Sequence, residues 1–348
     1  MLYIDMIAFY LQKAGGITVV WKELISRMLR DKCEVTLILQ DTPCENIYFK
    51  QIMDLNPKVI YEKGKYTKIK RYLSVNIPFN NEDTFVSTYY RIPNLSGIKQ
   101  FTIVHDFTYE YYVKGIRKVV HAWQKKNSVK NADTVVCVSN NTKEDLLKFY
   151  PWAKEKQIYV IYNGVNDIYR PLEQKEFIDE LGEYNQIPFF LFVGSRASYK
   201  RFDFAVDVAS YERRALVIVG GGLLNKQEKQ LLHDKLENNY IQLMGVSDET
   251  LNKLYNMAEA LLYPSEYEGF GIPVIEAQRA GCPVLAYAGS SVKEIVSEDM
   301  LLHTLDLEET HNILSKICSS ELRKQGYMNA KRFSWEDTYS QYKGVFGI

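Results

Sequence analysis

Short runs of β-branched and aromatic residues alternate with amphipathic stretches along almost the whole chain, and this alternation restricts the fold more than any other feature. In residues 15–31, for example, apolar side chains recur at helical spacing between two apolar runs. Such alternation predicts parallel sheets with helices on both faces, which is an α/β fold. The predicted strands lie within residues 1–9, 34–39, 83–88, 99–106, 133–139, 158–164, 189–194, 215–222, 241–245, 260–265 and 282–287.

A chain of 348 residues is longer than one hydrophobic core usually supports, so two domains are expected. Turn-forming residues in 163–174 precede an acidic polar stretch and predict the boundary. The prediction is an N-terminal domain over residues 1–166 and a C-terminal domain over 167–332. Residues 333–348 predict a final helix with Ser334 as its N-cap and acidic residues in its first turn.

The formal net charge of zero conceals a division between the two halves. Residues 1–168 contain 24 Lys and Arg against 17 Asp and Glu, which leaves 19 basic and 26 acidic residues for the remainder. A basic first half and an acidic second half indicate separate partners for each. Uneven surface charge without a function would give the same totals.

The cysteine content and the apolar runs indicate a cytosolic protein. The five cysteines are odd in number and scattered, which indicates neither a disulfide framework nor a zinc site. No apolar run approaches the roughly 20 residues of a membrane span, and the N-terminus lacks the layout of a signal peptide. We therefore expect a reducing cytosol. The cysteines are Cys33, Cys44, Cys137, Cys282 and Cys318.

The stretch "PSEYEGFGIPVIEA", residues 264–277, predicts a ligand site at the carboxyl end of a strand. Gly269 and Gly271 allow close approach of the backbone, and the helix that follows offers free N–H groups to an anion. Glu268 before the turn and Glu276 one turn into the helix bracket the site, and a carboxylate suits a vicinal diol. A lone glutamate in such a place would be read as solvated, but two acids around one glycine turn favour a ligand.

Three further stretches carry candidate side chains beside strand ends. Arg196, Lys200 and Arg201 follow the strand at 189–194, where cations can neutralise a diphosphate; an ordinary polar loop is the alternative. Gly15 and Gly16 lie between the first strand and the first helix, where phosphates approach a doubly wound fold, or where a tight turn needs no ligand. His105 and Asp106 end another strand and could orient a sugar or assist proton transfer. No metal-ligand cluster or Ser-His-Asp set is evident.

With these residues in view, the chain resembles the retaining family 4 glycosyltransferases, also described as glycosyl transferases group 1. The resemblance implies the GT-B fold, in which two Rossmann-like doubly wound domains face each other across a cleft. The paired glutamates of "YEGFGIPVIEA" are its most specific element, and the other segments occur in the family's order. Those segments are "AGGITVVWKEL", "VHD", "ADTVVCVSNNTKEDL", "VIYNGV", "FVGSRASYKRFD", "LMGVSDETLNKLYNMAEALLYPS" and "FSWEDT".

The resemblance also implies a role for individual residues. Glu276 would hold the nucleotide ribose, Glu268 the donor sugar and Lys200 the diphosphate, with His105 beside the reacting sugar. Many members place arginine directly after the glycine of the 192–203 loop, where this chain has Ser195, so the phosphate role of Arg196 is less secure. The remaining donor-binding positions implied are Gly15, Gly16, Arg201, Gly245, Val246, Phe270, Gly271 and Ile272.

The expected activity is transfer of a hexose from a UDP- or GDP-sugar to a hydroxyl of a glycan or lipid-linked acceptor, with retention and without a metal or other cofactor. A bacterial surface-polysaccharide pathway is expected from the resemblance. Residues 63–72 and 115–130 are basic and amphipathic and would place the cytoplasmic protein on an anionic membrane, unless they are solvated helix faces. Nucleic acid is not an expected partner. The alternatives are a nucleotide-sugar 2-epimerase of GT-B fold and a nonenzymatic nucleotide-sugar-binding protein.

Overall fold

The computed structural model describes residues 1–65, 69–174, 176–317 and 320–348. The chain divides into two compact units, unit 1 with Met1–Asn163 and Trp335–Ile348, and unit 2 with Gly164–Ser334. The expected boundaries were 166/167 and 332/333, so the division lies a few residues from each. Cys318 and part of the basic stretch 63–72 lie outside the described residues.

Unit 1 is built on a seven-stranded parallel sheet in the order β3-β2-β1-β4-β5-β6-β7. The order reverses between β1 and β4, so right-handed crossovers place the connecting helices on opposite faces. The strands are β1 (Leu2–Asp5), β2 (Val35–Asp41), β3 (Lys58–Lys65), β4 (Thr84–Ser87), β5 (Lys99–Val104), β6 (Thr134–Cys137) and β7 (Gln157–Val160). The helices are α1 (Ile7–Leu11), α2 (Gly16–Arg30), α3 (Phe49–Met53), α4 (Thr108–Tyr112), α5 (Ile116–Asn131), α6 (Asn140–Phe149), α14 (Trp335–Phe346) and the 3₁₀ helices η1 (Lys70–Tyr72) and η2 (Pro151–Glu155).

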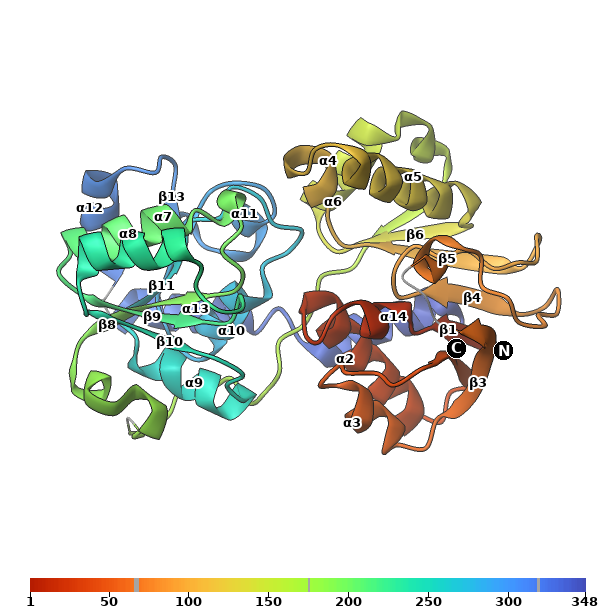
Figure 1. The fold of residues 1–348 in the computed structure, drawn as a ribbon, viewed down its shortest axis with the longest axis horizontal. Coiled ribbons are helices and arrows are strands. Elements are labelled where there is room, and N and C mark those ends of the chain that lie inside the picture. Colours follow the sequence, from red (N-terminus) through yellow and green to blue (C-terminus); the bar gives the residue numbers. More distant parts are fainter. Residues whose placement is uncertain (66–68, 175, 318–319) are drawn as a thin grey trace. The chain divides into compact units, whose positions relative to one another are not determined.

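Unit 2 repeats this plan with a six-stranded parallel sheet in the order β10-β9-β8-β11-β12-β13 (Figure 1). Its order reverses between β8 and β11. The strands are β8 (Phe189–Val193), β9 (Ala215–Val219), β10 (Tyr240–Leu243), β11 (Ala260–Tyr263), β12 (Val284–Tyr287) and β13 (Leu301–Leu302). The helices are α7 (Phe202–Tyr211), α8 (Lys226–Leu236), α9 (Asp248–Met257), α10 (Ile272–Arg279), α11 (Val292–Ile295), α12 (Leu307–Ile317), α13 (Ser320–Ala330) and the 3₁₀ helices η3 (Asp179–Gln186), η4 (Ser198–Lys200) and η5 (Glu298–Met300).

Each of the eleven predicted strands overlaps a strand of the structure, and the α/β fold class is confirmed. Two strands, β3 and β13, were not predicted. β3 lies at the edge of its sheet and contains the charged sequence "KVIYEKGK", while β13 is only two residues long. Neither has the continuous apolar run that identifies a central parallel strand.

The last helix, α14, packs on unit 1, so both chain ends lie in that unit (Figure 1). Its buried Phe346 contacts Phe101 of β5 with ring centroids 4.9 Å apart. On its exposed side, Glu336 pairs with Arg27 and Arg30 of α2 at 3.1 and 3.0 Å. No helix in the described part of the chain is long and apolar enough to cross a bilayer.

A buried ion-pair network joins three segments of unit 1. The Arg91 guanidinium, which is fully buried after β4, lies 3.1 Å from Asp5 at the end of β1 and 2.8 Å from Glu62 on β3. It also donates to the Leu73 carbonyl at 2.9 Å. Removing one partner of such a network leaves the others charged and unpaired in an apolar interior.

We therefore expect Arg91→Met to lower the free energy of unfolding of unit 1 by about 3–5 kcal/mol. All four tryptophans lie in unit 1, so intrinsic fluorescence during urea denaturation follows this unit. Arg30→Met is the control, because Arg30 makes an exposed pair with Glu336 worth about 1 kcal/mol or less. Equal losses for the two variants would contradict a structural role for the network.

Candidate functional site

The candidate site of unit 2 lies where the strand order reverses, between β8 and β11. In open parallel sheets, ligands bind beyond the carboxyl ends of the strands at this point, because the two following loops diverge there. The loop after β8 contains Arg196 and leads into η4, and the loop after β11 contains Glu268. The backbone N–H of Glu266 donates to the Tyr199 carbonyl at 2.8 Å, which joins the two loops.

At this junction the side chains of Lys200 and Glu268 form an ion pair with Nζ and Oε1 2.6 Å apart. Both side chains are largely buried, at 14% and 13% exposure, so water weakens the pair little. Lys200 Nζ also lies 5.7 Å from the centre of the Tyr263 ring at the end of β11. The sequence predicted both residues for one site, and the structure brings them into direct contact although 67 residues separate them.

Two serines hold the 268–271 loop in place, and the sequence analysis did not identify them. Ser290 Oγ accepts from the backbone N–H of Glu268 at 2.7 Å. Ser291 Oγ, which is fully buried, donates to the carbonyls of Glu268 at 2.8 Å and Phe270 at 3.1 Å. The signal that could have identified them is the "GSS" in the loop after β12, since the loops after parallel strands lie at the same sheet edge, here that of the loop after β11.

Helix α10 begins at this loop. Gly271 has a φ of +107°, which a residue with a Cβ rarely adopts, and its added Cβ would lie 3.1 Å from Ile295 Cδ1. Pro273 occupies the first turn, where its missing N–H costs no hydrogen bond. Phe270, before the turn, is buried and packs edge-on against Phe333 at 5.9 Å. The start of α10 therefore presents N–H groups, including that of Ile272, beside the Lys200–Glu268 pair.

Glu276, one turn further along α10, has a strongly altered carboxyl group. Burial raises its pKa to about 8, the charge of Asp248 adds to the rise, and hydrogen bonds from Tyr255 and Tyr169 oppose it. Tyr255 donates to it at 3.1 Å. A carboxyl group that is protonated at neutral pH can both donate and accept hydrogen bonds, which suits hydroxyl groups.

The two glutamates share a neighbour, the buried phenol of Tyr263. Burial raises the pKa of Tyr263 well above its usual value, and the charges of Glu268 and Glu276 both raise it further. Lys200, Glu268 and Glu276 therefore gather around the end of β11. Tyr169, Tyr255 and Tyr263 were missed by the sequence analysis because isolated tyrosines resemble ordinary core residues.

Arg196 and Arg201 follow the same strand but are engaged elsewhere. The Arg196 guanidinium donates to the carbonyls of the glycine loop after β9 and lies 3.0 Å from Glu228. Its acceptors are the carbonyls of Gly220, Gly221, Gly222 and Leu223, at 2.9 to 3.2 Å. Arg201, in the left-handed conformation before α7, pairs with Asp203 at 3.0 Å and Glu266 at 3.1 Å. Their predicted contacts with a donor remain predictions.

Gly245 and Val246 connect β10 to α9 near the same sheet edge. Gly245 has a φ of +64°, and Ser247 caps α9 by accepting from the Thr250 N–H at 3.1 Å. Gly245 is exposed and Val246 partly exposed, so the segment is accessible to a ligand.

Unit 1 contains the remaining predicted residues. Gly15 caps the N-terminus of α2 and Gly16 is its first residue, beside the reversal of strand order at β1 and β4. His105 directly follows β5 and is buried, and its Nε2 has no hydrogen-bond partner in the described part of the chain. Burial lowers the pKa of His105 to about 4, Asp106 opposes this change and Lys125 adds to it. The imidazole is therefore neutral at physiological pH.

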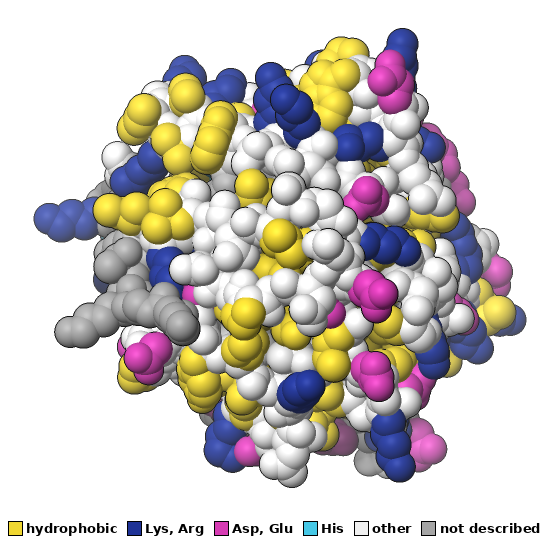
Figure 2. Space-filling view, turned by 90° about the vertical axis from the view of Figure 1, so that its right-hand side faces the viewer, with side chains coloured by type: hydrophobic (Ala, Val, Ile, Leu, Met, Phe, Trp, Pro, Cys, Tyr) yellow, Lys and Arg dark blue, Asp and Glu magenta, His cyan; other side chains and the backbone are white. Residues whose placement is uncertain are grey.

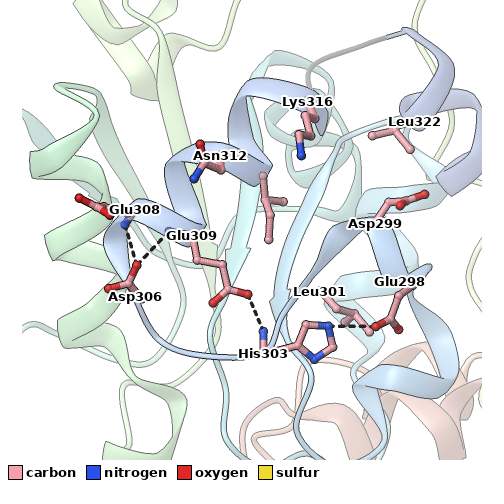
Figure 3. A pocket seen from close by; sticks show the side chains of 11 residues that line it. Glu298, Asp299, Leu301, His303, Asp306, Glu308, Glu309, Asn312, Lys316 and Leu322 are labelled. Carbon is pink, nitrogen blue, oxygen red and sulfur yellow. Dashed lines mark hydrogen bonds and ion pairs between the residues drawn. The ribbon is translucent and has the colours of Figure 1, made fainter.

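A separate acidic hollow in unit 2, of about 670 Å³, lies between η5 and α12 (Figure 3). Its carboxylates bond to neighbouring groups. Glu309 accepts from the N–H groups of His303 and Thr304 at 3.1 Å, and Glu298 lies 2.9 Å from His303. No set of three or more His, Cys, Asp or Glu residues arranged to hold a metal ion occurs within the described ranges. These contacts stabilise the loop before α12.

Two doubly wound α/β units in one chain are the architecture of the GT-B glycosyltransferases. Residues 173–331 match the model of the family "Glycosyl transferases group 1", and residues 14–168 match that of "Glycosyltransferase Family 4". The chain belongs to this family of glycosyltransferases, as the sequence predicted.

Individual proteins are similar to this chain in sequence or in fold. O-antigen chain mannosyltransferase RfbU of Salmonella typhimurium is 32% identical over 243 residues, and the match covers 68% of this chain but 65% of that protein, just under two thirds of its length. Sucrose-phosphate synthase from Thermosynechococcus elongatus has a similar structure, with a TM-score of 0.76 at 18% identity over 99% of this chain and 98% of that one. HepE of Anabaena, solved with UDP and glucose, gives a TM-score of 0.74 at 13% identity over the same shares.

A titration tests the environment of Glu276. We expect the carboxyl carbon of Glu276, assigned by its loss in Glu276→Gln, to titrate near pH 8 in ¹³C NMR. Tyr255→Phe removes a hydrogen bond that favours the ionised form, so this midpoint should rise further.

The raised pKa of Glu276 also determines whether stability rises or falls with pH. Between the unfolded pKa of about 4.3 and the folded value, the folded chain keeps a proton that the unfolded chain has released. Wild-type protein should therefore lose stability relative to Glu276→Gln as pH rises to about 8, as measured by calorimetry. A midpoint near 4.5 and equal pH dependence of the two proteins would contradict a buried Glu276.

Proposed function

We propose that this glycosyltransferase moves a hexose from a UDP- or GDP-sugar to a hydroxyl of a glycan or lipid-linked acceptor, with retention of the anomeric configuration. The observation that supports it best is the pairing of Lys200 with Glu268 at the start of α10, with Glu276 in the same neighbourhood. A mannosyltransferase of O-antigen synthesis among the relatives supports a role in bacterial surface polysaccharide synthesis. HepE, a structural neighbour, was solved with UDP and glucose, which supports a nucleotide-sugar donor.

In this proposal each group of the unit 2 site contacts one part of the donor. Glu276 holds the ribose hydroxyls, and its protonated carboxyl both donates and accepts. The base lies at Gly245 and Val246. Lys200 and the N–H groups at Gly271 and Ile272 hold the diphosphate, because a cation and a helix N-terminus both favour negative charge.

In this proposal, the carboxylate of Glu268 has one partner when the site holds no donor and another when the donor is bound. Without donor it neutralises Lys200 at 2.6 Å. With donor bound, the diphosphate takes over the positive charge of Lys200, and Glu268 accepts hydrogen bonds from the sugar hydroxyls. The exchange replaces one charge-assisted contact by another, so Lys200 is never buried without a negative partner.

Transfer requires breakage of the bond between the anomeric carbon and the diphosphate oxygen. Charge grows on the diphosphate as the bond breaks, and Lys200 with the amides of α10 stabilises it, in place of a bound metal ion. The acceptor hydroxyl attacks from the face that the diphosphate leaves, which retains the configuration, and its proton passes to the leaving group. The roles expected for His105, Gly15 and Gly16 of unit 1, at the reacting sugar and its phosphates, remain predictions.

We further propose that the protein works in the cytoplasm, at the inner face of the membrane, where a lipid-linked acceptor would be found. A nucleotide-sugar 2-epimerase would use the same donor groups without an acceptor. The transferase relatives and the family models favour transfer.

Lys200→Ala should lower turnover by about 10²-fold or more, because it removes charge that stabilises the leaving group. The measurement is release of nucleoside diphosphate from the donor in the presence of acceptor. Lys235→Ala is a matched control, since Lys235 of α8 makes a partly exposed pair with Asp207 of α7 and has no place in the candidate site. Turnover of Lys200→Ala equal to that of the control would exclude the proposed role.

A donor screen tests the function itself. Thermal shifts with UDP-, GDP- and dTDP-sugars identify the donor, because a ligand that binds only the folded state raises the melting temperature. Glu276→Ala should reduce the shift for the identified donor by weakening its ribose contacts. NMR of the product then shows whether the anomeric configuration is kept. A change of the sugar in donor incubated alone would favour the epimerase.

A further inference from the structure

Helix α5 of unit 1 exposes an unusual number of large apolar side chains. Ile116, Val119 and Trp123 have exposures of 74%, 62% and 56%. At 100° per residue they lie on one stripe, and Lys126 and Lys130 continue it within an arc of about 80°. The stripe therefore changes from apolar to basic along one face of the helix. Helix α5 contains five basic residues and no Asp or Glu.

A concave region adjoins the basic end of this stripe. It has a volume of about 560 Å³ and is lined by Lys126, Lys130, Trp152, Glu155 and Lys156. Lys126 and Lys130 are exposed and have no ion pair with any acid in the ranges that the structure describes. Lys156 donates to the Ala132 carbonyl at 2.6 Å, which fixes its position. Three ammonium groups against one carboxylate favour an anion such as a phosphate.

A second segment with exposed apolar side chains lies next to α5. Gln124 of α5 donates to the Arg71 carbonyl of η1 at 2.6 Å, so these two segments lie side by side. Segment η1 is flanked by Ile69 and Leu73, which are 67% and 56% exposed. In Figure 2, hydrophobic and basic side chains lie together in the upper part of the face shown. Two stretches more than 40 residues apart in the sequence are thus neighbours in unit 1, and both expose apolar side chains.

We propose that this α5 surface docks on a membrane of anionic phospholipid. The apolar stripe enters the interface between headgroups and acyl chains, and the three-lysine hollow holds a lipid phosphate. Charge complementarity selects this partner, because exposed apolar side chains interleaved with unpaired cations are typical of interfacial helices. The proposal deepens the proposed function, since it places unit 1 where a lipid-linked acceptor is available.

The experiment is co-sedimentation of the full chain with vesicles, without donor or acceptor. We expect binding to phosphatidylcholine vesicles with about 30% phosphatidylglycerol at 50 mM salt, and loss of most binding in pure phosphatidylcholine or at 500 mM salt. Trp123→Ala should weaken binding by about tenfold or more, because it removes the largest inserted side chain. Lys126→Gln and Lys130→Gln should each weaken it about fivefold.

Matched controls lie elsewhere on unit 1. Leu55→Ser removes an apolar side chain of 48% exposure, and Lys50→Gln removes a cation of 85% exposure, so neither should change vesicle binding. A blue shift of tryptophan fluorescence on vesicle addition should be lost in Trp123→Phe. The melting temperatures of all variants should match that of wild type, since the changed side chains are exposed.

Three results would overturn the proposal. They are absence of binding at low salt, equal loss of binding in the control variants, and equal binding to neutral and anionic vesicles. Concentration-dependent self-association that Trp123→Ala abolishes, without vesicle binding, would instead make the surface an interface between copies. Transfer to a water-soluble acceptor should be unchanged in the α5 variants, and this assay separates failure of docking from failure of the proposed function.

Discussion

The candidate site depends on an ion pair between Lys200 and Glu268, whose charged atoms lie 2.6 Å apart. The two residues follow β8 and β11, the neighbouring strands between which the strand order of the unit 2 sheet reverses. A largely buried ion pair persists only where the surrounding structure fixes both partners. Here η4 positions Lys200, and Ser290 and Ser291 fix the backbone of the loop that contains Glu268. The position of the start of α10, and with it the proposed donor site, depends on this arrangement.

The two glutamates of the loop and helix occupy different environments, and this difference separates their chemistry. Glu268 faces the ammonium group of Lys200 at 2.6 Å. Glu276 faces tyrosines and Asp248 in a buried setting, which raises its pKa to about 8. In sequence the two residues look alike, eight positions apart. In the proposed function, this difference leaves Glu268 to exchange Lys200 for sugar hydroxyls when a diphosphate binds, and makes Glu276 a neutral group suited to hydroxyls.

The basic and acidic halves of the sequence correspond closely to the two units of the structure. The basic first half forms unit 1, where cations gather along α5 and around the hollow beside Trp152. The acidic second half forms unit 2, where the candidate site contains Glu268 and Glu276 and further carboxylates line the hollow before α12. Separate surfaces of opposite character are consistent with separate partners for the two units.

The sequence by itself determined the fold class and eleven of the thirteen strands in the described ranges, and it predicted Lys200, Glu268 and Glu276 for one candidate site. It did so because buried parallel strands need continuous apolar runs and because Glu268 and Glu276 lie within one short segment around a glycine turn. The tertiary structure decided which distant groups meet. Arg196 contacts the glycine loop after β9, and η1 contacts α5. Ser290, Ser291 and three tyrosines lie at the candidate site. Such contacts arise from the folding of remote segments onto one sheet edge, and hydrophobic periodicity contains no information about which polar side chains will then be neighbours.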